Sequence, residues 1–362
     1  MNHPAPHLDC LIAKAGQLYT LPAVAMQVLE LTGDPSVDTH ALKKCVENDP
    51  ALTTKILQVV NSSLFGLSGH VSDLNQALAL LGIKPLKLLV LGFSLPTRFF
   101  QDIAGEVLSD YWRHTLTKAV AAREITETLW RQAGDEAFIA GLLQDLGSLL
   151  LIQELGEPYV ELLRKVRTEG ADLLGCERRA LGFDHTTLTA AILRRWRLPE
   201  VLSAAVEVGT GSREAHWPAS QTPDLRQVLQ LAELVARLLA DAETGVLGEL
   251  LATGRQFCSL TPARLDDLVS TLGEKVRQLA DVFSLQLPGG ADYVDILARA
   301  HRRLAEVASE AAAEMIAGRQ HAEAARGPAA EAILEQITSL CDAAASAVQR
   351  TPAPATTVAA IS

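Results

Sequence analysis

Residues 48–60 read Asn-Asp-Pro-Ala-Leu-Thr-Thr-Lys-Ile-Leu-Gln-Val-Val and carry the clearest helix signal in the chain. The Asp49 carboxylate can accept hydrogen bonds from the free N–H groups of a first turn, and Pro50 follows where a missing N–H is harmless. The stretch therefore predicts a capped helix that begins at Pro50. The apolar residues expected on its inner face are Leu52, Ile56, Val59 and Val60.

Comparable patterns surround this helix. Pro22 opens an earlier helix, and Asp38 can cap the next one. Further on, Ser72 opens another helix that Gly82 ends in a left-handed conformation, and Pro85 starts a fifth. The inner faces predicted for the two earlier helices are Leu21, Val24, Val28 and Leu31 in the first, and Leu42, Cys45 and Val46 in the second.

The segment 135–155 is apolar apart from Gln144, Asp145 and Ser148, which predicts a central buried helix. Polar side chains in such a helix need partners, because a buried polar group without a hydrogen bond is unfavourable. Residues 209–224 are rich in Gly, Pro, Ser and Thr and predict a loop.

The composition favours an all-α protein and excludes several other classes. Aromatic residues make up only 4% of the chain, which is low for a β-sandwich or barrel, whereas the abundant Ala and Leu are strong helix formers. The 48% of hydrophobic residues excludes wholesale disorder. With 32 basic and 43 acidic residues, the formal net charge of −11 opposes binding to nucleic acid or to an anionic membrane.

The spacing of the cysteines and the N-terminal residues predict a cytoplasmic protein. The five cysteines are dispersed, without a CxxC pair or a zinc spacing, which is typical of reduced thiols in a cytosol. Residues 1–9 show no secretory signal. The most hydrophobic window, 78–95, is interrupted by Gly82 and Pro85 and predicts two buried helices around a turn.

Five polar residues in or beside apolar helical stretches form the candidate site, namely His114, Gln144, Asp145, His185 and Glu233. They offer imidazoles and carboxylates, the ligand types that metal-assisted phosphoester hydrolysis places around an ion. A histidine in a buried helix is more often a hydrogen-bonded core residue than a metal ligand. Both interpretations remain open on the residues alone.

Several sequence blocks, in order over residues 16–212, resemble the HDOD domain, the "HD-related output domain" of bacterial signalling proteins. These blocks are LPAVAMQVLEL at 21–31, NDPALTTKIL at 48–57, VNSSLFG at 60–66, QALALLG at 76–82, AFIAGLLQDLG at 137–147, LGFDH at 181–185 and WRLP at 196–199. The resemblance implies an all-α fold, in which an N-terminal helical subdomain precedes a degenerate HD-like helical core.

Carried over residue by residue, the resemblance matches His114 to the first metal-binding histidine of the HD hydrolases and Asp145 to their aspartate. Gln144 stands where those enzymes have a second histidine, and Glu233 falls near their final aspartate. His185 matches a histidine of the HD-GYP phosphodiesterases, whose later His-His pair and Gly-Tyr-Pro signature are absent from this sequence.

These departures imply a degenerate HD site. A neutral glutamine oxygen is a poor ligand for a transition metal beside imidazole, and a missing ligand weakens the clamp that hydrolysis requires. We therefore expect no catalytic residue, no metal and no cofactor, so the five positions are vestigial. His114, Asp145 and His185 are expected to form a buried hydrogen-bond network.

The expected organisation has five parts. An N-terminal extension at 1–15 precedes the HDOD domain at 16–212, and residues 213–290 complete the HD-like core with further helices. Residues 291–350 predict amphipathic, signalling-type helices that pair in a short coiled coil or lie against the domain. Residues 351–362 are expected to be disordered.

The function implied by the resemblance is that of a non-catalytic bacterial signal-transduction module acting through protein–protein contacts, with cyclic-di-GMP-linked signalling as one setting. Expected partners are signalling proteins of the GGDEF, EAL or response-regulator type, and a second copy paired through the C-terminal helices. Two alternatives stay open: a residual metal-dependent phosphohydrolase, and a nucleotide-sensing module without catalysis. The net charge of −11 disfavours a nucleic-acid-binding regulator.

Overall fold

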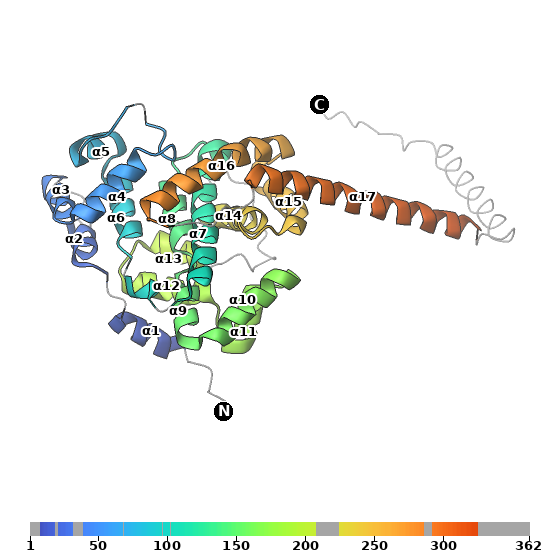
Figure 1. Ribbon diagram of the computed structural model, residues 1–362, viewed down its shortest axis with the longest axis horizontal. Helices are drawn as coiled ribbons and strands as arrows, with labels where there is room; N and C mark the ends of the chain where they lie inside the picture. Colours follow the sequence, from blue (N-terminus) through green and yellow to red (C-terminus); the bar gives the residue numbers. More distant parts are fainter. Residues whose placement is uncertain are drawn as a thin grey trace, which may run out of the picture. The chain divides into compact units, whose positions relative to one another are not determined.

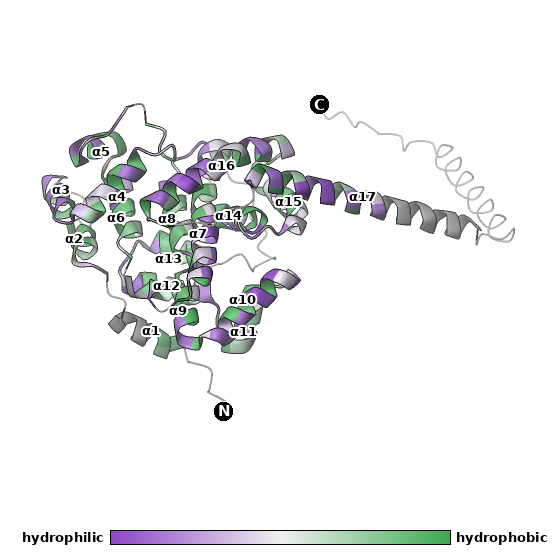
Figure 2. Ribbon diagram, in the orientation of Figure 1, coloured by the Kyte–Doolittle hydropathy of each residue, from purple (hydrophilic) through white to green (hydrophobic). Residues whose placement is uncertain are grey.

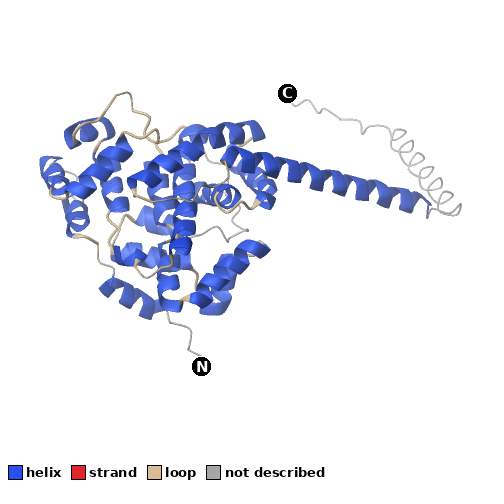
Figure 3. Ribbon diagram, in the orientation of Figure 1, coloured by secondary structure: helices blue, strands red, loops and turns tan. Residues whose placement is uncertain are grey.

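The computed structural model describes residues 8–18, 21–31, 39–67, 69–95, 97–101, 103–207, 224–285 and 292–324. Within these residues the chain forms helices and connecting loops and no β-strand (Figure 3). The predicted all-α class is confirmed. The chain divides into two compact units, Met1–Leu304 and Ala305–Ser362.

The first unit begins with α1 Leu8–Leu18, α2 Ala23–Leu31, α3 Thr39–Glu47, α4 Pro50–Val60, α5 Leu74–Leu81, α6 Ile83–Phe93 and the short helix η1 Thr97–Phe100 (Figure 1). It continues with α7 Gly105–Ile125, η2 Thr126–Trp130, α8 Asp135–Leu143, α9 Leu146–Leu155, α10 Glu157–Glu169, α11 Leu173–Leu181, α12 His185–Arg195 and α13 Glu200–Glu207. The remaining helices are α14 Leu225–Leu239, η3 Thr244–Val246, α15 Leu247–Cys258, α16 Pro262–Val282 and α17 Tyr293–Ala324.

The helices predicted in the first part of the sequence are present, with three differences in detail, and the predicted cap Asp38 lies outside the described residues. Asp49 caps α4 by accepting a hydrogen bond from the Leu52 N–H at 3.0 Å, as predicted. The cap of α5 is Asp73 rather than the predicted Ser72, because the Asp73 carboxylate accepts from the first free N–H groups. Gly82 ends α5 at a φ of 84°, but its ψ of 178° lies outside the left-handed helical region. The following helix begins before Pro85, at Ile83.

The segment 135–155 is two helices and not the single one predicted. Gln144 and Asp145 form a turn between α8 and α9, and the Ser148 hydroxyl donates to the Asp145 carbonyl at 2.7 Å. By length and composition this stretch is apolar enough to cross a membrane, but 83% of its apolar window is buried inside the protein. Such burial is typical of core helices.

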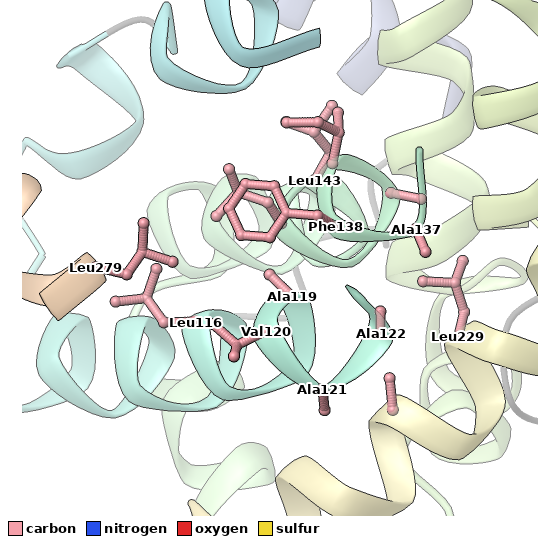
Figure 4. Packing of buried hydrophobic residues seen from close by; sticks show 14 of the residues in the cluster. Leu116, Ala119, Val120, Ala121, Ala122, Ala137, Phe138, Leu143, Leu229 and Leu279 are labelled. Atoms are coloured by element: carbon pink, nitrogen blue, oxygen red, sulfur yellow. The ribbon is translucent and has the colours of Figure 1, made fainter. Parts of the chain in front are cut away.

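Helix α7 lies at the centre of the first unit and packs against α8, α14 and α16. Every residue from Thr115 to Ile125 is buried. Figure 4 shows the small alanines of α7 facing apolar side chains of the neighbouring helices. Gly141 of α8 comes so close that an added Cβ would lie 3.0 Å from the Ala119 Cα. Small residues on both helices therefore permit their close approach.

The loop after α4 is fastened to this core. The Asn61 side chain accepts a hydrogen bond from the Val71 N–H at 2.7 Å and donates one to the Val71 carbonyl at 2.8 Å. Arg123 of α7 donates to the Leu64 carbonyl at 3.1 Å, and its guanidinium lies 4.1 Å from the ring centre of Phe65. These contacts give the Asn-Ser-Ser-Leu-Phe-Gly block a structural role.

Helix α16 precedes the amphipathic helices predicted at 291–350, and Figure 2 shows both hydrophilic and hydrophobic residues along it. The first turns of α17 belong to the first unit, where Ile296 and Leu297 are buried. The Tyr293 hydroxyl lies 2.7 Å from Thr117 Oγ1 of α7.

Several sequence predictions fall outside the described residues: most of the loop at 209–224, the break at 288–290, the second amphipathic helix and the tail at 351–362. The proposed domain boundaries and the pairing of C-terminal helices between two copies stay predictions.

Candidate functional site

All five sequence-predicted site residues line one cavity of about 440 Å³. α7 supplies His114, the turn between α8 and α9 supplies Gln144 and Asp145, α12 begins with His185, and α14 contributes Glu233. Residues distant in sequence therefore meet where α7, α9, α12 and α14 come together.

Lys118 occupies the centre of this arrangement. It lies one helical turn after His114, on the same face of α7. Its Nζ pairs with Asp145 Oδ2 and lies 3.0 Å from Glu233 Oε2. Only 1% of the Lys118 side chain is exposed. The two carboxylates that the resemblance assigned to an ion thus share a lysine ammonium instead.

His114 is held between two carboxylates. Its Nδ1 lies 2.7 Å from Asp241 Oδ2, and its Nε2 lies 3.1 Å from Glu233 Oε2. Burial by itself would lower the pKa of His114, but Asp241 and Glu233 outweigh it and raise that pKa to about 10. At neutral pH His114 is therefore an imidazolium that donates from both ring nitrogens.

His185 is arranged in the same way at the other end of the cavity. Its Nδ1 lies 2.8 Å from Glu177 Oε2, and its Nε2 lies 3.5 Å from Asp145 Oδ1. Burial opposes the charge, yet Glu177 and Asp145 raise the pKa of His185 to about 10. The Tyr159 hydroxyl donates to Glu177 Oε1 at 2.5 Å, which completes the partners of that carboxylate.

Asp145 joins the two halves of the site. Burial would raise the pKa of its carboxyl, but Lys118 and the hydrogen bond from His185 lower it to about 2. The groups form a continuous series that we call the ion-pair chain: Asp241, His114, Glu233, Lys118, Asp145, His185 and Glu177. Its members alternate between negative and positive charge along the whole series.

Gly147 explains why the ion-pair chain can form at the start of α9. A Cβ at this position would lie 2.1 Å from the His185 carbonyl oxygen, so only glycine allows α9 to approach α12 so closely. The Gly147 N–H donates to Thr189 Oγ1 at 2.8 Å, and that hydroxyl donates to the His185 carbonyl at 2.9 Å. The Asp-Leu-Gly sequence after Gln144 therefore sets the distance between Asp145 and His185.

The donor set does not fit a divalent cation. A metal ligand must offer a lone pair, whereas the Lys118 ammonium between Asp145 and Glu233 offers only N–H donors. Within the described part of the chain, no three His, Cys, Asp or Glu side chains are placed to hold a metal ion. Chemically, the arrangement holds a fixed pattern of charge rather than activating water.

Sequence reasoning missed three members of the ion-pair chain. Lys118 had a readable signal, because it lies one turn after His114 and directly before the apolar run Ala-Val-Ala-Ala of α7. Asp241 lies just beyond the end of α14, and Glu177 lies in a helix of mixed polarity. Neither carboxylate differs in sequence context from an exposed one, so only the folded structure identifies them.

A family model for the HDOD domain matches residues 18–210, more than half of the chain. An uncharacterized protein of Treponema pallidum (strain Nichols) is 26% identical over 234 residues, which are 62% of this chain and 43% of that protein. The chain therefore spans less than half of the length of this curated relative.

Solved structures are also similar to this chain. A proposed phosphohydrolase from Shewanella amazonensis SB2B is 20% identical with a TM-score of 0.56, and the match covers 75% of this chain and 98% of that one. An HDOD domain protein of unknown function from Geobacter sulfurreducens is 19% identical with a TM-score of 0.48, covering 83% and 95% of the two chains. At 20% identity, the likeness to the Shewanella protein concerns the fold alone.

Proposed function

Because the chain belongs to the HDOD domain family, we propose that it is a signal-transduction module that works through protein contacts and does not hydrolyse phosphate esters. The observation that carries this proposal is the position of Lys118. Its ammonium stands between Asp145 and Glu233, the two carboxylates that a catalytic cation would need.

The charges around Lys118 support a module without hydrolytic activity. Metal-assisted hydrolysis uses the ion to lower the pKa of bound water and to stabilise charge on the reacting oxygens. A lysine ammonium donates hydrogen bonds but has no vacant coordination position for water. His114 and His185 are committed to carboxylates on both ring nitrogens. Neither imidazole is therefore free to act as a general base.

The rival function is residual phosphohydrolase activity, and the fold likeness to the Shewanella protein is the observation that favours it. That reading needs Lys118 to leave both carboxylates so that an ion can enter. The Lys118 side chain, which is only 1% exposed, would have to move its ammonium to another place in the interior or into water. Such a move breaks two buried ion pairs, which is strongly unfavourable.

The proposal places the protein in the cytoplasm, where it would contact signalling proteins of the GGDEF, EAL or response-regulator type. Cyclic-di-GMP-linked circuits are the setting that we favour. The charge of −11 argues against a nucleic-acid partner. A two-hybrid matrix of this chain against GGDEF, EAL and receiver domains of its own organism would identify the partner class.

The catalytic part of the proposal is tested by metal content and activity together. We expect purified protein to carry well below one equivalent of Mn, Fe, Ni or Zn by plasma mass spectrometry, and to release no phosphate from a panel of phosphate esters. The double variant His114→Ala, Asp145→Ala should give the same result. Near-stoichiometric metal in the wild type that is lost in the double variant would contradict the proposal.

A further inference from the structure

The cavity beside the ion-pair chain has two unlike walls. Beside Arg164 and Arg167, α10 and α11 contribute the apolar part of the lining, which consists of Val160, Leu163, Val166, Leu173 and Leu174. The charged part of the lining comes from α7, α14, the turn between α8 and α9 and the start of α12, and it holds every member of the ion-pair chain except Glu177. The volume of about 440 Å³ lies within the range of small-molecule sites, which are mostly apolar with a few placed polar groups.

The cations of the cavity are all committed to carboxylates. Those of the ion-pair chain are paired as described above. Arg167 lies 2.9 Å from Asp110 and 3.4 Å from Asp241, and Arg237 lies 2.8 Å from Glu243. Arg164, at the exposed rim, pairs with Glu157 at 2.9 Å.

The balance of charge in the cavity disfavours an anionic ligand. Seven carboxylates line it, against six cationic side chains, counting only the residues that the structure describes. A phosphate group would have to displace a carboxylate from its partner and would meet the remaining acidic groups. An uncharged ligand meets neither obstacle.

Gln144 marks the place where such a ligand can be recognised. The residue is 2% exposed and lines the cavity, and its Oε1 accepts no hydrogen bond from the described residues. A buried acceptor without a partner is unfavourable unless something else supplies the hydrogen. The Tyr111 hydroxyl lines the same cavity, and burial raises its pKa well above the ordinary value, so it stays protonated.

We propose that this cavity binds a small uncharged molecule whose apolar body lies against α10 and α11 and whose N–H or O–H group donates to Gln144 Oε1. The inference deepens the proposed function, because it assigns the input of the signalling module, and it rests on that function in one respect: the ligand is bound and not cleaved. Gln144 is then a recognition residue at a position where hydrolases of this fold are expected to hold metal.

Three matched pairs of probes test the charge preference. Benzamide and benzoate, nicotinamide and nicotinate, and adenosine and its 5′-monophosphate differ mainly in charge. We expect saturation-transfer NMR and calorimetry to detect the uncharged member of at least one pair, with binding about tenfold tighter than its anionic counterpart. The proposal is overturned if no uncharged probe binds at millimolar concentration, or if the anionic members bind more tightly.

The variant Gln144→Leu tests the recognising atom. It keeps the side-chain size and removes the acceptor, so binding of the uncharged probe should weaken about tenfold. The matched control Gln227→Leu alters a buried glutamine of α14 that does not line the cavity, and should leave binding unchanged. Equal binding by Gln144→Leu and wild type would overturn the assignment.

Two further readouts separate the possible failures. Because Gln144→Leu removes an unpaired buried acceptor, the unliganded variant should melt about 2 °C higher than the wild type. A lower melting temperature would show that the amide is a structural element and would contradict its recognition role. Phosphate released from adenosine 5′-monophosphate would instead refute the proposed function, whether or not the uncharged probes bind.

Discussion

Two faces of α7 differ in what they bury. On one face Ala119 approaches Gly141 of α8 through small apolar contacts. On the other, His114 and Lys118 lie against the carboxylates of Glu233 and Asp145. Close apolar packing stabilises a fold directly, whereas buried ion pairs roughly offset the desolvation of their own charges. We therefore interpret the apolar face as the part that positions the helix and the charged face as the part that serves function.

Removing the central charge of the ion-pair chain should cause a large loss of stability. Lys118→Met leaves Asp145 and Glu233 buried without their shared partner, and should lower the free energy of unfolding by about 4 kcal/mol. Urea denaturation measures this loss. The combined variant Lys118→Met, Asp145→Leu, Glu233→Leu removes all three charges and should recover most of the stability. A mild effect of Lys118→Met alone would show that the ion pairs are not formed in solution.

The charged face should also make stability depend on pH. His114 and His185 have their pKa raised from 6.5 to about 10, so each holds an extra proton in the folded state over that range. Their contribution is complete below pH 6.5 and is lost as the pH rises towards 10, at about 1.4 kcal/mol per pH unit for each histidine.

Urea denaturation between pH 6.5 and 9.5 measures this slope. The variant His114→Gln should show a shallower decline than the wild type, because one of the two protons is no longer involved. A stability that stays level or rises over this interval would contradict the assignment of both histidines as imidazolium ions.

The apolar face gives the smallest expected effect. Gly141→Ala places a Cβ 3.0 Å from the Ala119 Cα, and the backbone must shift to admit it. Thermal or urea denaturation should show a loss of about 1–3 kcal/mol. Gly245→Ala is the matched control, since nothing lies within 4 Å of the added atom. Equal stabilities of the two variants would show that the helices can separate without penalty.

Much of the fold could be predicted from the sequence, because the residues that start and end a helix are close together in the chain. Asp49 and Pro50 mark the start of α4 without reference to any distant residue. The break at Gln144 was not predicted, since hydrophobic periodicity continues on both sides of it. The turn there depends on contacts that α9 makes with α12 through Gly147 and Thr189.

The candidate site could be predicted from the sequence only in part. Polar residues in or beside apolar stretches gave five candidate positions, all of which line the cavity, although His114 and Glu233 lie outside the matching blocks of sequence. The sequence did not show which of these residues pair with one another. Lys118 and Asp241 acquire their importance through partners more than 25 residues away, as when Asp241 meets His114 of α7.

The central claim is that the Lys118 ammonium takes the place of a catalytic cation. The most direct test is a crystal structure of the full chain grown with millimolar Mn²⁺, with data collected to reveal anomalous scattering. We predict no anomalous peak between Asp145 and Glu233 and clear density for the Lys118 side chain reaching both carboxylates. An anomalous peak at that position, with Lys118 turned away, would contradict the account.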